Sequence, residues 1–258
     1  MLHHRAAVLH DLDSGFRQAA GRIVVADPRL HPDGARLGLG SGTTSAWMVR
    51  ALGEKVAEGL QVVGVPTSNS TRDLALSLDI PLVDINDLDQ PLDVTLDGPD
   101  EIDHDGDMIK GGGACLLWER MVAEASTKMV CIADDTKLVD HLGRFPLPIE
   151  VVQYGWQATR RSVSALLTDL GYDVEIVRRV RDGEPVVTDS GNFILDAHMG
   201  VITDKATLDT NLNWIAGVVE HGLFTGIAHE VLMASPSGES RLIELPHRNA
   251  ARIPEWRK

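Results

Sequence analysis

The sequence predicts an α/β protein in which a parallel sheet with helices on both faces is followed by a smaller α+β layer. Apolar strands alternate with helical segments over the first half of the chain, polar turns follow several strands, and the order of elements changes near Phe145. Alternating strands and helices are typical of a parallel sheet. Ligands bind such sheets beyond the carboxyl ends of the strands, so the polar turns are the first place to look for a site.

Each element of the first half follows from its local pattern. Short apolar runs indicate strands, and segments whose apolar residues recur at helical spacing indicate helices. We expect strands at 35–40, 60–66, 81–87, 92–98 and 128–137. We expect helices at 14–27, 46–52, 72–78 and 111–126.

The second half predicts a separate layer. Its strands are expected at 145–153, 172–180, 192–200 and 218–224, and its helices at 158–171 and 205–217. This order, β-α-β-β-α-β, is the ferredoxin-like order. Residues 226–235 then read as a strand that returns to the first sheet, and the tail at 247–258 is expected on the surface. We therefore expect one domain at 1–145 and 226–258, and an inserted domain at 146–225.

Composition narrows the function classes. The 258 residues suffice for one large domain or two modest ones. A net charge of -14 argues against nonspecific binding of nucleic acid or anionic membrane, although it allows a small anionic substrate in a local cationic pocket. The two cysteines, Cys115 and Cys131, form no CxxC pattern, which disfavours a zinc site and a disulfide framework. We see neither a signal peptide nor a transmembrane span, and we expect a cytoplasmic globular protein.

The first polar turn, GLGSGTTS, follows a strand and opens a helix. Glycines there let backbone N–H groups converge on an anion, and the hydroxyls of Ser41, Thr43 and Thr44 could add donors. The turn lacks the third glycine of a dinucleotide fingerprint and the lysine of a P-loop. A cradle for the phosphate of a small ester and an ordinary capped helix start both fit the pattern. The hydroxyl-rich turn at 67–71 is better explained as a helix cap.

The stretch LDGPDEIDHDGDMIKGGG contains six acidic residues, followed by one lysine and a run of three glycines. A calcium loop would need an acid at its twelfth position, which falls on Gly112. Asp105 and Asp107 are most simply read as a solvated turn. Three other acids sit where an apolar strand ends: Asp97, Asp100 and Glu101.

Lys110 leads into Gly111, Gly112 and Gly113, where a helix start would offer free N–H groups to an anion. Glu119 would lie about a turn and a half further along that helix, beside apolar neighbours. A carboxylate in that setting would be partly desolvated and its pKa raised, which suits a general base. The alternative is an exposed helix acid paired with Arg120. The segment CIADDTK adds two acids and Lys137 after another strand, and the alternative for it is a surface turn. The histidines show no metal-ligand spacing, so we expect no metal site.

Four segments in register, GLGSGTTS, LDGPDEID, IKGGGACLLWE and CIADDTKLVDHLGRFPLPIEV, closely resemble type A ribose-5-phosphate isomerase. NFILD and GVVEHGLF match later segments of the family, so the resemblance runs from about Phe16 to about Glu244. The family interconverts ribose 5-phosphate and ribulose 5-phosphate in the pentose phosphate pathway without a metal or organic cofactor. It implies a Rossmann-like domain with a ferredoxin-like domain, and a homodimer or homotetramer.

The resemblance also implies a role for each candidate residue. Glu119 is the expected base, and Asp97, Asp100 and Lys110 are expected to orient hydroxyls, assist ring opening and stabilise an enediolate. The expected substrate-binding residues are Gly40, Ser41, Gly42, Thr43, Thr44, Gly111, Gly112, Gly113 and Lys137. Donors placed where charge develops are what an enediolate needs.

Three residues depart from the family pattern. Ser41 stands where the family usually has threonine, and Leu117-Trp118 stand where a polar pair, often Thr-Arg, is expected. An isomerase of another phosphosugar therefore stays open. A non-catalytic sugar-phosphate-sensing module is the alternative from another class. It predicts an added DNA-binding segment and loss of the base, whereas only about 35 residues precede the first strand and the acids and lysine are present.

Overall fold

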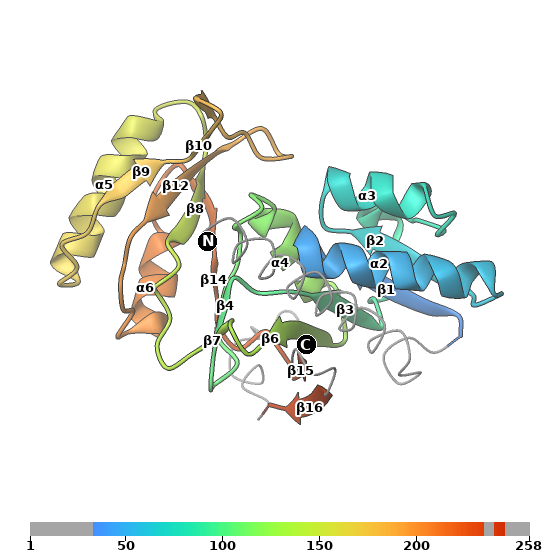
Figure 1. Ribbon diagram of the computed structural model, residues 1–258. Helices are drawn as coiled ribbons and strands as arrows, with labels where there is room; N and C mark the ends of the chain where they lie inside the picture. Colours follow the sequence, from blue (N-terminus) through green and yellow to red (C-terminus); the bar gives the residue numbers. More distant parts are fainter. Residues whose placement is uncertain (1–32, 235–239, 246–258) are drawn as a thin grey trace, which may run out of the picture. The chain divides into compact units, whose positions relative to one another are not determined.

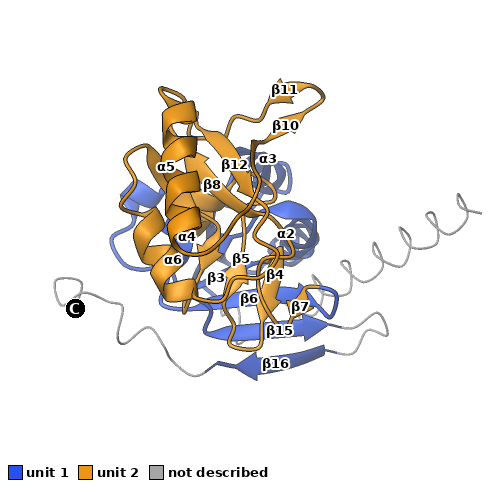
Figure 2. Cartoon of the chain, turned by 90° about the vertical axis from the view of Figure 1, so that its left-hand side faces the viewer, with its two compact units in different colours: residues 1–98, 121–136, 228–247 blue, residues 99–120, 137–227, 248–258 orange. Residues whose placement is uncertain are grey.

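The computed structural model describes residues 33–234 and 240–245, which form two compact units (Figure 2). The helix expected at 14–27 and the tail expected at 247–258 lie outside the described residues. No helix among the described residues is long and apolar enough to cross a membrane. Unit 1 comprises the described residues of 33–98, Met121–Thr136 and 228–245, and unit 2 comprises Pro99–Arg120 and Lys137–Ile227.

Unit 1 is built on a six-stranded sheet in the order β16-β15-β6-β3-β1-β2. Its strands are β1 (Ala35–Leu39), β2 (Val62–Pro66), β3 (Val94–Asp97), β6 (Met129–Asp134), β15 (Glu230–Ala234) and β16 (Ser240–Glu244). Neighbouring strands pair in parallel, except that β16 runs antiparallel to β15. The predicted α/β fold is confirmed, and β15 pairs with β6 as expected for the returning segment. The antiparallel edge strand β16 was not predicted and makes the sheet mixed.

Two helices of unit 1 follow strands directly: α2 (Gly42–Ala57) after β1, and α3 (Asn69–Leu76) after β2 (Figure 1). Met48 and Leu52 of α2 are buried in one core cluster with Leu37 and Leu39 of β1. Burial of such a side chain stabilises the fold by about 1.5–3 kcal/mol. The second polar turn is a helix cap, as predicted, because the Ser68 hydroxyl accepts the backbone N–H of Thr71 at 3.0 Å.

The strand predicted at 81–87 is wrong. Leu82 forms an isolated bridge with Gly64, and the chain then turns into the short 3-10 helix η1 (Ile85–Asp87). The Asp84 carboxylate accepts the backbone N–H of Asn86 at 2.8 Å. A local bond of this kind competes with strand pairing, which explains why an apolar run alone misled the prediction.

Unit 2 contains a four-stranded antiparallel sheet in the order β13-β8-β12-β9. Its strands are β8 (Leu147–Val151), β9 (Ile176–Arg178), β12 (Phe193–Ala197) and β13 (Val218–His221). Helices α5 (Trp156–Asp169) and α6 (Lys205–Leu212) lie side by side on one face of this sheet (Figures 1 and 2). Between β9 and β12 the short strands β10 (Val180–Arg181) and β11 (Glu184–Pro185) form a hairpin.

A second sheet of unit 2 includes two strands from the acidic stretch. Its order is β14-β5-β4-β7, with β4 (Glu101–Asp103), β5 (Met108–Ile109), β7 (Leu138–Val139) and β14 (Leu223–Phe224). The single strand predicted at 218–224 is therefore two strands in two sheets, β13 and β14. The chain changes sheets at Gly222, where an added Cβ would lie 2.1 Å from the Lys110 carbonyl oxygen, so this close backbone crossing requires glycine.

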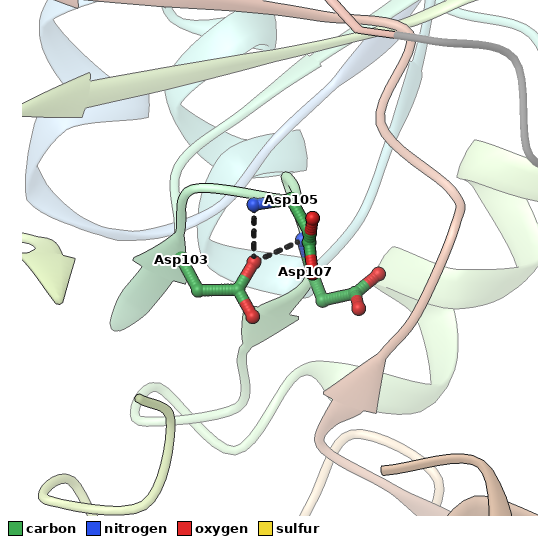
Figure 3. A group of neighbouring side chains, drawn as sticks. All are labelled: Asp103, Asp105 and Asp107. Carbon is green, nitrogen blue, oxygen red and sulfur yellow. Dashed lines mark hydrogen bonds between the residues drawn. The ribbon is translucent and has the colours of Figure 1, made fainter. Parts of the chain in front are cut away.

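The β4–β5 hairpin is closed by an acidic turn, whose three aspartates are drawn in Figure 3, and Lys205 of α6 pairs with this turn. Asp103 Oδ1 accepts the backbone N–H groups of Asp105 and Asp107, each at 3.0 Å. Lys205 Nζ of α6 lies 2.6 Å from Asp103 Oδ2 and 2.5 Å from Asp107 Oδ2. Asp105 is exposed as predicted, but Asp107 is buried, so the prediction of a solvated turn is wrong for Asp107. Its counter-charge comes from a residue far along the chain, which local sequence cannot show.

The Lys205 ammonium is held in its charged form by these carboxylates. Burial lowers the pKa of Lys205, but hydrogen bonds to Asp103 and Asp107 outweigh burial, and the pKa is raised above its usual range. The ion cluster therefore fixes the turn of the hairpin whose two ends carry Asp100 and Lys110.

We predict that Lys205→Met lowers the free energy of unfolding by about 1–3 kcal/mol. The loss should be smaller than the roughly 3–5 kcal/mol of a fully buried pair because Lys205 is partly exposed. Urea denaturation at neutral pH measures the change. Lys55→Met is the matched control, because Lys55 pairs with Glu58 on the exposed face of α2, where a pair contributes about 0–1 kcal/mol. Equal losses in the two variants would contradict a stabilising role for the cluster.

Candidate active site

In unit 1, the glycine turn meets Asp97 at the carboxyl ends of β1 and β3. These adjacent strands form the switch point of the sheet, because β2 lies on one side of β1 and β3 on the other. The Gly40 N–H donates to the Leu96 carbonyl at 3.0 Å, and the Ser41 N–H donates to Asp97 Oδ1 at 3.1 Å. A Cβ at Gly40 would lie 2.2 Å from that same oxygen, so the approach requires glycine.

The Ser41 hydroxyl contacts other buried hydroxyls of the protein. Its Oγ lies within hydrogen-bond distance of the hydroxyls of Thr67 (2.7 Å), Ser68 (2.8 Å) and Thr71 (3.2 Å). This buried cluster joins the two polar turns that the sequence singled out. Helix α2 then begins at Gly42, and Gly42 and Thr43 are exposed. The first-turn N–H groups of α2, rather than the Ser41 hydroxyl, are thus the donors of this loop that are placed for an anion.

In unit 2, Lys110 and Glu119 form a buried pair. Lys110 Nζ lies 3.4 Å from Glu119 Oε1, and the two side chains are 1% and 7% exposed. The Lys110 N–H donates to the Gly222 carbonyl at 2.9 Å, and the Glu119 N–H donates to the Cys115 carbonyl at 3.0 Å. A charge in such surroundings is costly unless it is paired, and the pair satisfies that requirement. The sequence named Arg120 as the alternative partner of an exposed Glu119, whereas Glu119 is buried and lies beside Lys110.

The glycines between them form a turn, not the start of a helix. Helix α4 (Leu116–Glu124) begins three residues after Gly113, so the helix predicted from 111 is wrong over its first five residues. Positive φ angles at Gly111 (102°) and Ala114 (61°) interrupt the right-handed helical conformation. Glu119 consequently lies in the first turn of α4 and not a turn and a half inside it.

Asp100 is placed by this glycine turn. Its Oδ2 accepts the Gly112 N–H at 2.7 Å, and its own N–H donates to the Ile109 carbonyl at 2.8 Å. Asp100 and Lys110 therefore flank the β4–β5 hairpin, and the glycine turn continues from its second strand. Lys137 is half-buried, and its carbonyl accepts the Ile102 N–H at 2.9 Å. Glu101 is buried and accepts the N–H groups of Gly143 and Phe145, so it serves the fold.

Sequence reasoning missed residues around the Lys110–Glu119 pair. Arg120 of α4 lies 2.7 Å from Glu220, and its Nη2 donates to the His221 and Leu223 carbonyls. The Phe224 ring lies 4.1 Å from the Arg120 guanidinium carbon and 5.8 Å from Lys110 Nζ, measured to its centroid. Contacts of a cation with an aromatic face stabilise by about 0.5–2 kcal/mol. The only signal in the sequence was the match of GVVEHGLF to a family segment, which assigns no role to a particular residue.

Among the described residues, Asp103, Asp105 and Asp107 are the group whose carboxylates gather closely enough to hold a metal ion. Lys205 Nζ already lies within 3.6 Å of all three side chains. The group therefore serves the hairpin as an ion cluster with its own cation.

Glu150 of β8 is a buried carboxyl near the start of α4. Its Oε1 accepts hydrogen bonds from Thr188 Oγ1 (2.8 Å) and Asn192 Nδ2 (2.9 Å). Burial raises the pKa of Glu150, and these two hydrogen bonds lower it without cancelling the effect of burial. Glu150 borders a small pocket that is also lined by Leu117 and Trp118.

Comparison with known proteins agrees with the resemblance seen in the sequence. Residues 63–238 match the model of the family described as ribose 5-phosphate isomerase A (phosphoriboisomerase A). The chain is 50% identical over 226 residues to ribose-5-phosphate isomerase A 2 of Yersinia pseudotuberculosis, covering 87% of this chain and 94% of that protein. It is 51% identical over 228 residues to ribose-5-phosphate isomerase A of Nitrobacter hamburgensis, covering 88% and 96%.

A solved structure is similar over most of its length. It is a D-ribose-5-phosphate isomerase in complex with phospho-erythronic acid, which superimposes with a TM-score of 0.79 at 34% sequence identity. The match covers 89% of this chain and 97% of that one.

We predict that Glu150→Gln stabilises the protein increasingly as pH rises. Because the pKa of Glu150 is raised above 4.5, the folded state binds this proton more tightly than the unfolded chain. Stability is therefore lost as pH rises from about 4.5 through the folded-state pKa, and glutamine, which cannot ionise, avoids the loss. Urea denaturation of both proteins at several pH values between 5 and 8 measures the difference.

Asp204→Asn is the control for this series. The hydrogen bonds of Thr207 lower the pKa of Asp204, so its carboxylate is already ionised in both states across that range. The effect of Asp204→Asn should therefore not change with pH between 5 and 8. If the difference in free energy of unfolding between Glu150→Gln and the parent is also independent of pH between 5 and 8, Glu150 is already ionised in the folded state at pH 5, and the prediction is wrong.

Proposed function

The chain belongs to the ribose-5-phosphate isomerase A family, and we propose that it interconverts D-ribose 5-phosphate and D-ribulose 5-phosphate. The observation that supports this most is the buried pair of Lys110 and Glu119. Aldose–ketose isomerisation requires a base that moves a proton between two neighbouring carbons and a cation or donor that stabilises the intermediate.

Glu119 is the proposed base. Its carboxylate removes the proton from C2 of the open-chain aldose, the electrons shift to the carbonyl at C1, and an enediolate forms. The proton of the C2 hydroxyl passes to the oxygen at C1, and the protonated carboxyl returns its proton to C1, which gives the ketose with its carbonyl at C2. Glu119 lies in the first turn of α4, at the end of the helix whose dipole attracts negative charge. The same carboxyl serves both proton transfers at carbon.

Lys110 and the turn from Gly111 to Gly113 are proposed to stabilise the enediolate. The ammonium is buried, and a charge in such a site acts more strongly on developing negative charge than it would in water. Asp100, which the glycine turn holds by one oxygen, is proposed to orient a sugar hydroxyl and assist ring opening.

The phosphate is assigned to unit 1. The first-turn N–H groups of α2 at Gly42, Thr43 and Thr44 supply donors and the positive end of a helix dipole. Gly40 and Ser41 shape the loop through their bonds to Leu96 and Asp97. Asp97 is proposed to share the orienting role of Asp100, and Lys137 is proposed as a further substrate contact.

The family supports several broader proposals. The β-α-β-β-α-β segment of unit 2 is proposed to be a ferredoxin-like domain, at 146–225, inserted into a Rossmann-like domain. A homodimer or homotetramer that acts in the cytoplasm, in the non-oxidative branch of the pentose phosphate pathway, is proposed on the same ground. We propose that the reaction needs no metal or organic cofactor, because the residues assigned above supply the base and the electrophile.

We predict that Glu119→Gln lowers the rate of ribulose 5-phosphate formation about 10²- to 10⁴-fold, the usual contribution of a general base. Glutamine keeps the shape of the side chain and cannot accept the proton. Formation of ribulose 5-phosphate from ribose 5-phosphate, measured with EDTA present, provides the test. Wild-type activity should survive the chelator.

Glu124→Gln is the matched control, because Glu124 lies exposed in the same helix and undergoes the same chemical change. It should leave the rate unchanged. Full activity of Glu119→Gln would show that another residue is the base. A wild type inactive on ribose 5-phosphate but active on another phosphosugar would assign a different substrate, and inactivity on every phosphosugar would favour a sensor.

A further inference from the structure

We propose that Arg179 is a positioning residue for the isomerisation, because it holds the glycine turn after Lys110 by two of its carbonyl oxygens. The proposal rests on the function proposed above and extends it to a residue that the motifs leave out. Arg179 lies 68 residues from Gly111 in the sequence, at the junction of β9 and β10.

The contacts of Arg179 divide between a carboxylate and the turn. Its Nε and Nη2 donate to Asp196 Oδ2 (2.8 Å) and Oδ1 (2.5 Å), which makes a bidentate pair. Its Nη1 donates to the Gly111 carbonyl at 2.7 Å and to the Gly112 carbonyl at 3.0 Å. The side chains of Arg179 and Asp196 are 12% and 14% exposed. The planar fork is thus fixed on one edge by Asp196 and presents the other edge to the turn.

The backbone of Arg179 is itself well anchored. Its N–H donates to the Ile194 carbonyl at 2.8 Å, and its carbonyl accepts the Val186 N–H at 3.0 Å. Asp196 lies on β12, a central strand of the four-stranded antiparallel sheet, where it pairs with Val177 of β9 and Pro148 of β8. The guanidinium therefore extends from a rigid part of unit 2 toward a part rich in glycine.

The hydrogen bonds from Arg179 to the two carbonyl oxygens also set the direction of neighbouring N–H groups, because of the geometry of the peptide bond. In a planar trans peptide, the carbonyl and the N–H of the next residue point in opposite directions. Holding the Gly111 carbonyl therefore aims the Gly112 N–H, and this N–H does donate to Asp100 Oδ2 at 2.7 Å. Holding the Gly112 carbonyl aims the Gly113 N–H away from Arg179 in the same manner. One guanidinium thus sets the direction of two successive N–H groups.

The turn needs such a restraint because glycine is the least restricted residue. Three glycines in a row lose much conformational entropy when they are ordered, and Gly111 adopts a φ of 102°. Without Arg179, these peptides could rotate, and Asp100 would lose the donor that orients it. The pair with Asp196 balances the charge of Arg179, so its contribution to the reaction is the placement of other groups.

The test compares four variants by kinetics and by hydrogen exchange. Arg179→Met removes the donors, and Arg179→Lys keeps the charge but loses the planar fork. The double variant Arg179→Met, Asp196→Leu removes both charges together, so that no carboxylate is left buried alone. Arg181→Met, an exposed arginine two residues away, is the control.

We expect kcat to fall about 10- to 100-fold in Arg179→Met and in the double variant, and by less in Arg179→Lys, because misplacement of about 1 Å near the chemistry has effects of this size. KM for ribose 5-phosphate should change less than about threefold, since the phosphate contacts are elsewhere. Amide hydrogen exchange in peptides that span 110–116 should accelerate in the same variants and stay unchanged in Arg181→Met.

Two results would overturn the proposal. One is a wild-type kcat in folded Arg179→Met or in the folded double variant. The other is unchanged hydrogen exchange at 110–116, which does not depend on catalytic activity and therefore decides the proposal even if the wild type converts no ribose 5-phosphate. If the wild type is inactive but the variants exchange faster, the proposed function is refuted, while the restraint of the glycine turn by Arg179 is supported.

Discussion

The buried pair of Lys110 and Glu119 is the interaction on which the candidate site of unit 2 depends. Two charges with almost no exposure are tolerated only when they lie close together, because either one alone would be strongly destabilising. The chain must therefore deliver a strand end and a helix start to the same point. It does so with the β4–β5 hairpin, the glycine turn and the first turn of α4, which follow one another without interruption from Glu101 to Arg120.

The supports of that pair come from distant parts of unit 2. Lys205 of α6 holds the turn of the hairpin, and Arg179 holds the glycine turn. Arg120 fastens α4 to the carbonyls of His221 and Leu223 on either side of Gly222. Arg179 and Arg120 each pair with one carboxylate, and Lys205 lies among three, so each cation orients backbone or neighbouring charge while carboxylates offset its own charge.

The sequence predicted the elements that depend on local pattern, and its motifs indicated which residues to consider for the candidate site. The alternation of strands and helices indicated the sheet of unit 1, and the hydroxyl-rich turn indicated the cap at Ser68. It failed where a distant partner decides the outcome: Asp107 is buried because Lys205 reaches it, and the strand predicted at 218–224 breaks at Gly222 because the Lys110 carbonyl passes so close. The start of α4 was misplaced because glycines can begin a helix or precede one, and only the φ angles decide.

The distances within these ion pairs differ in a way that suits their proposed tasks. The supporting pairs are short: 2.7 Å for Arg120 with Glu220, 2.5 Å for Arg179 with Asp196 and 2.6 Å for Lys205 with Asp103. Lys110 Nζ and Glu119 Oε1 are 3.4 Å apart. A carboxylate bound tightly to an ammonium would be a poor base, since the cation favours its unprotonated form. We propose that the longer separation leaves Glu119 able to take a proton and allows Lys110 to turn to the oxygen on which charge develops. On this proposal, the short ion pairs at the supports hold the surrounding structure in place, and the longer pair of Lys110 and Glu119 leaves the reactive groups able to exchange partners.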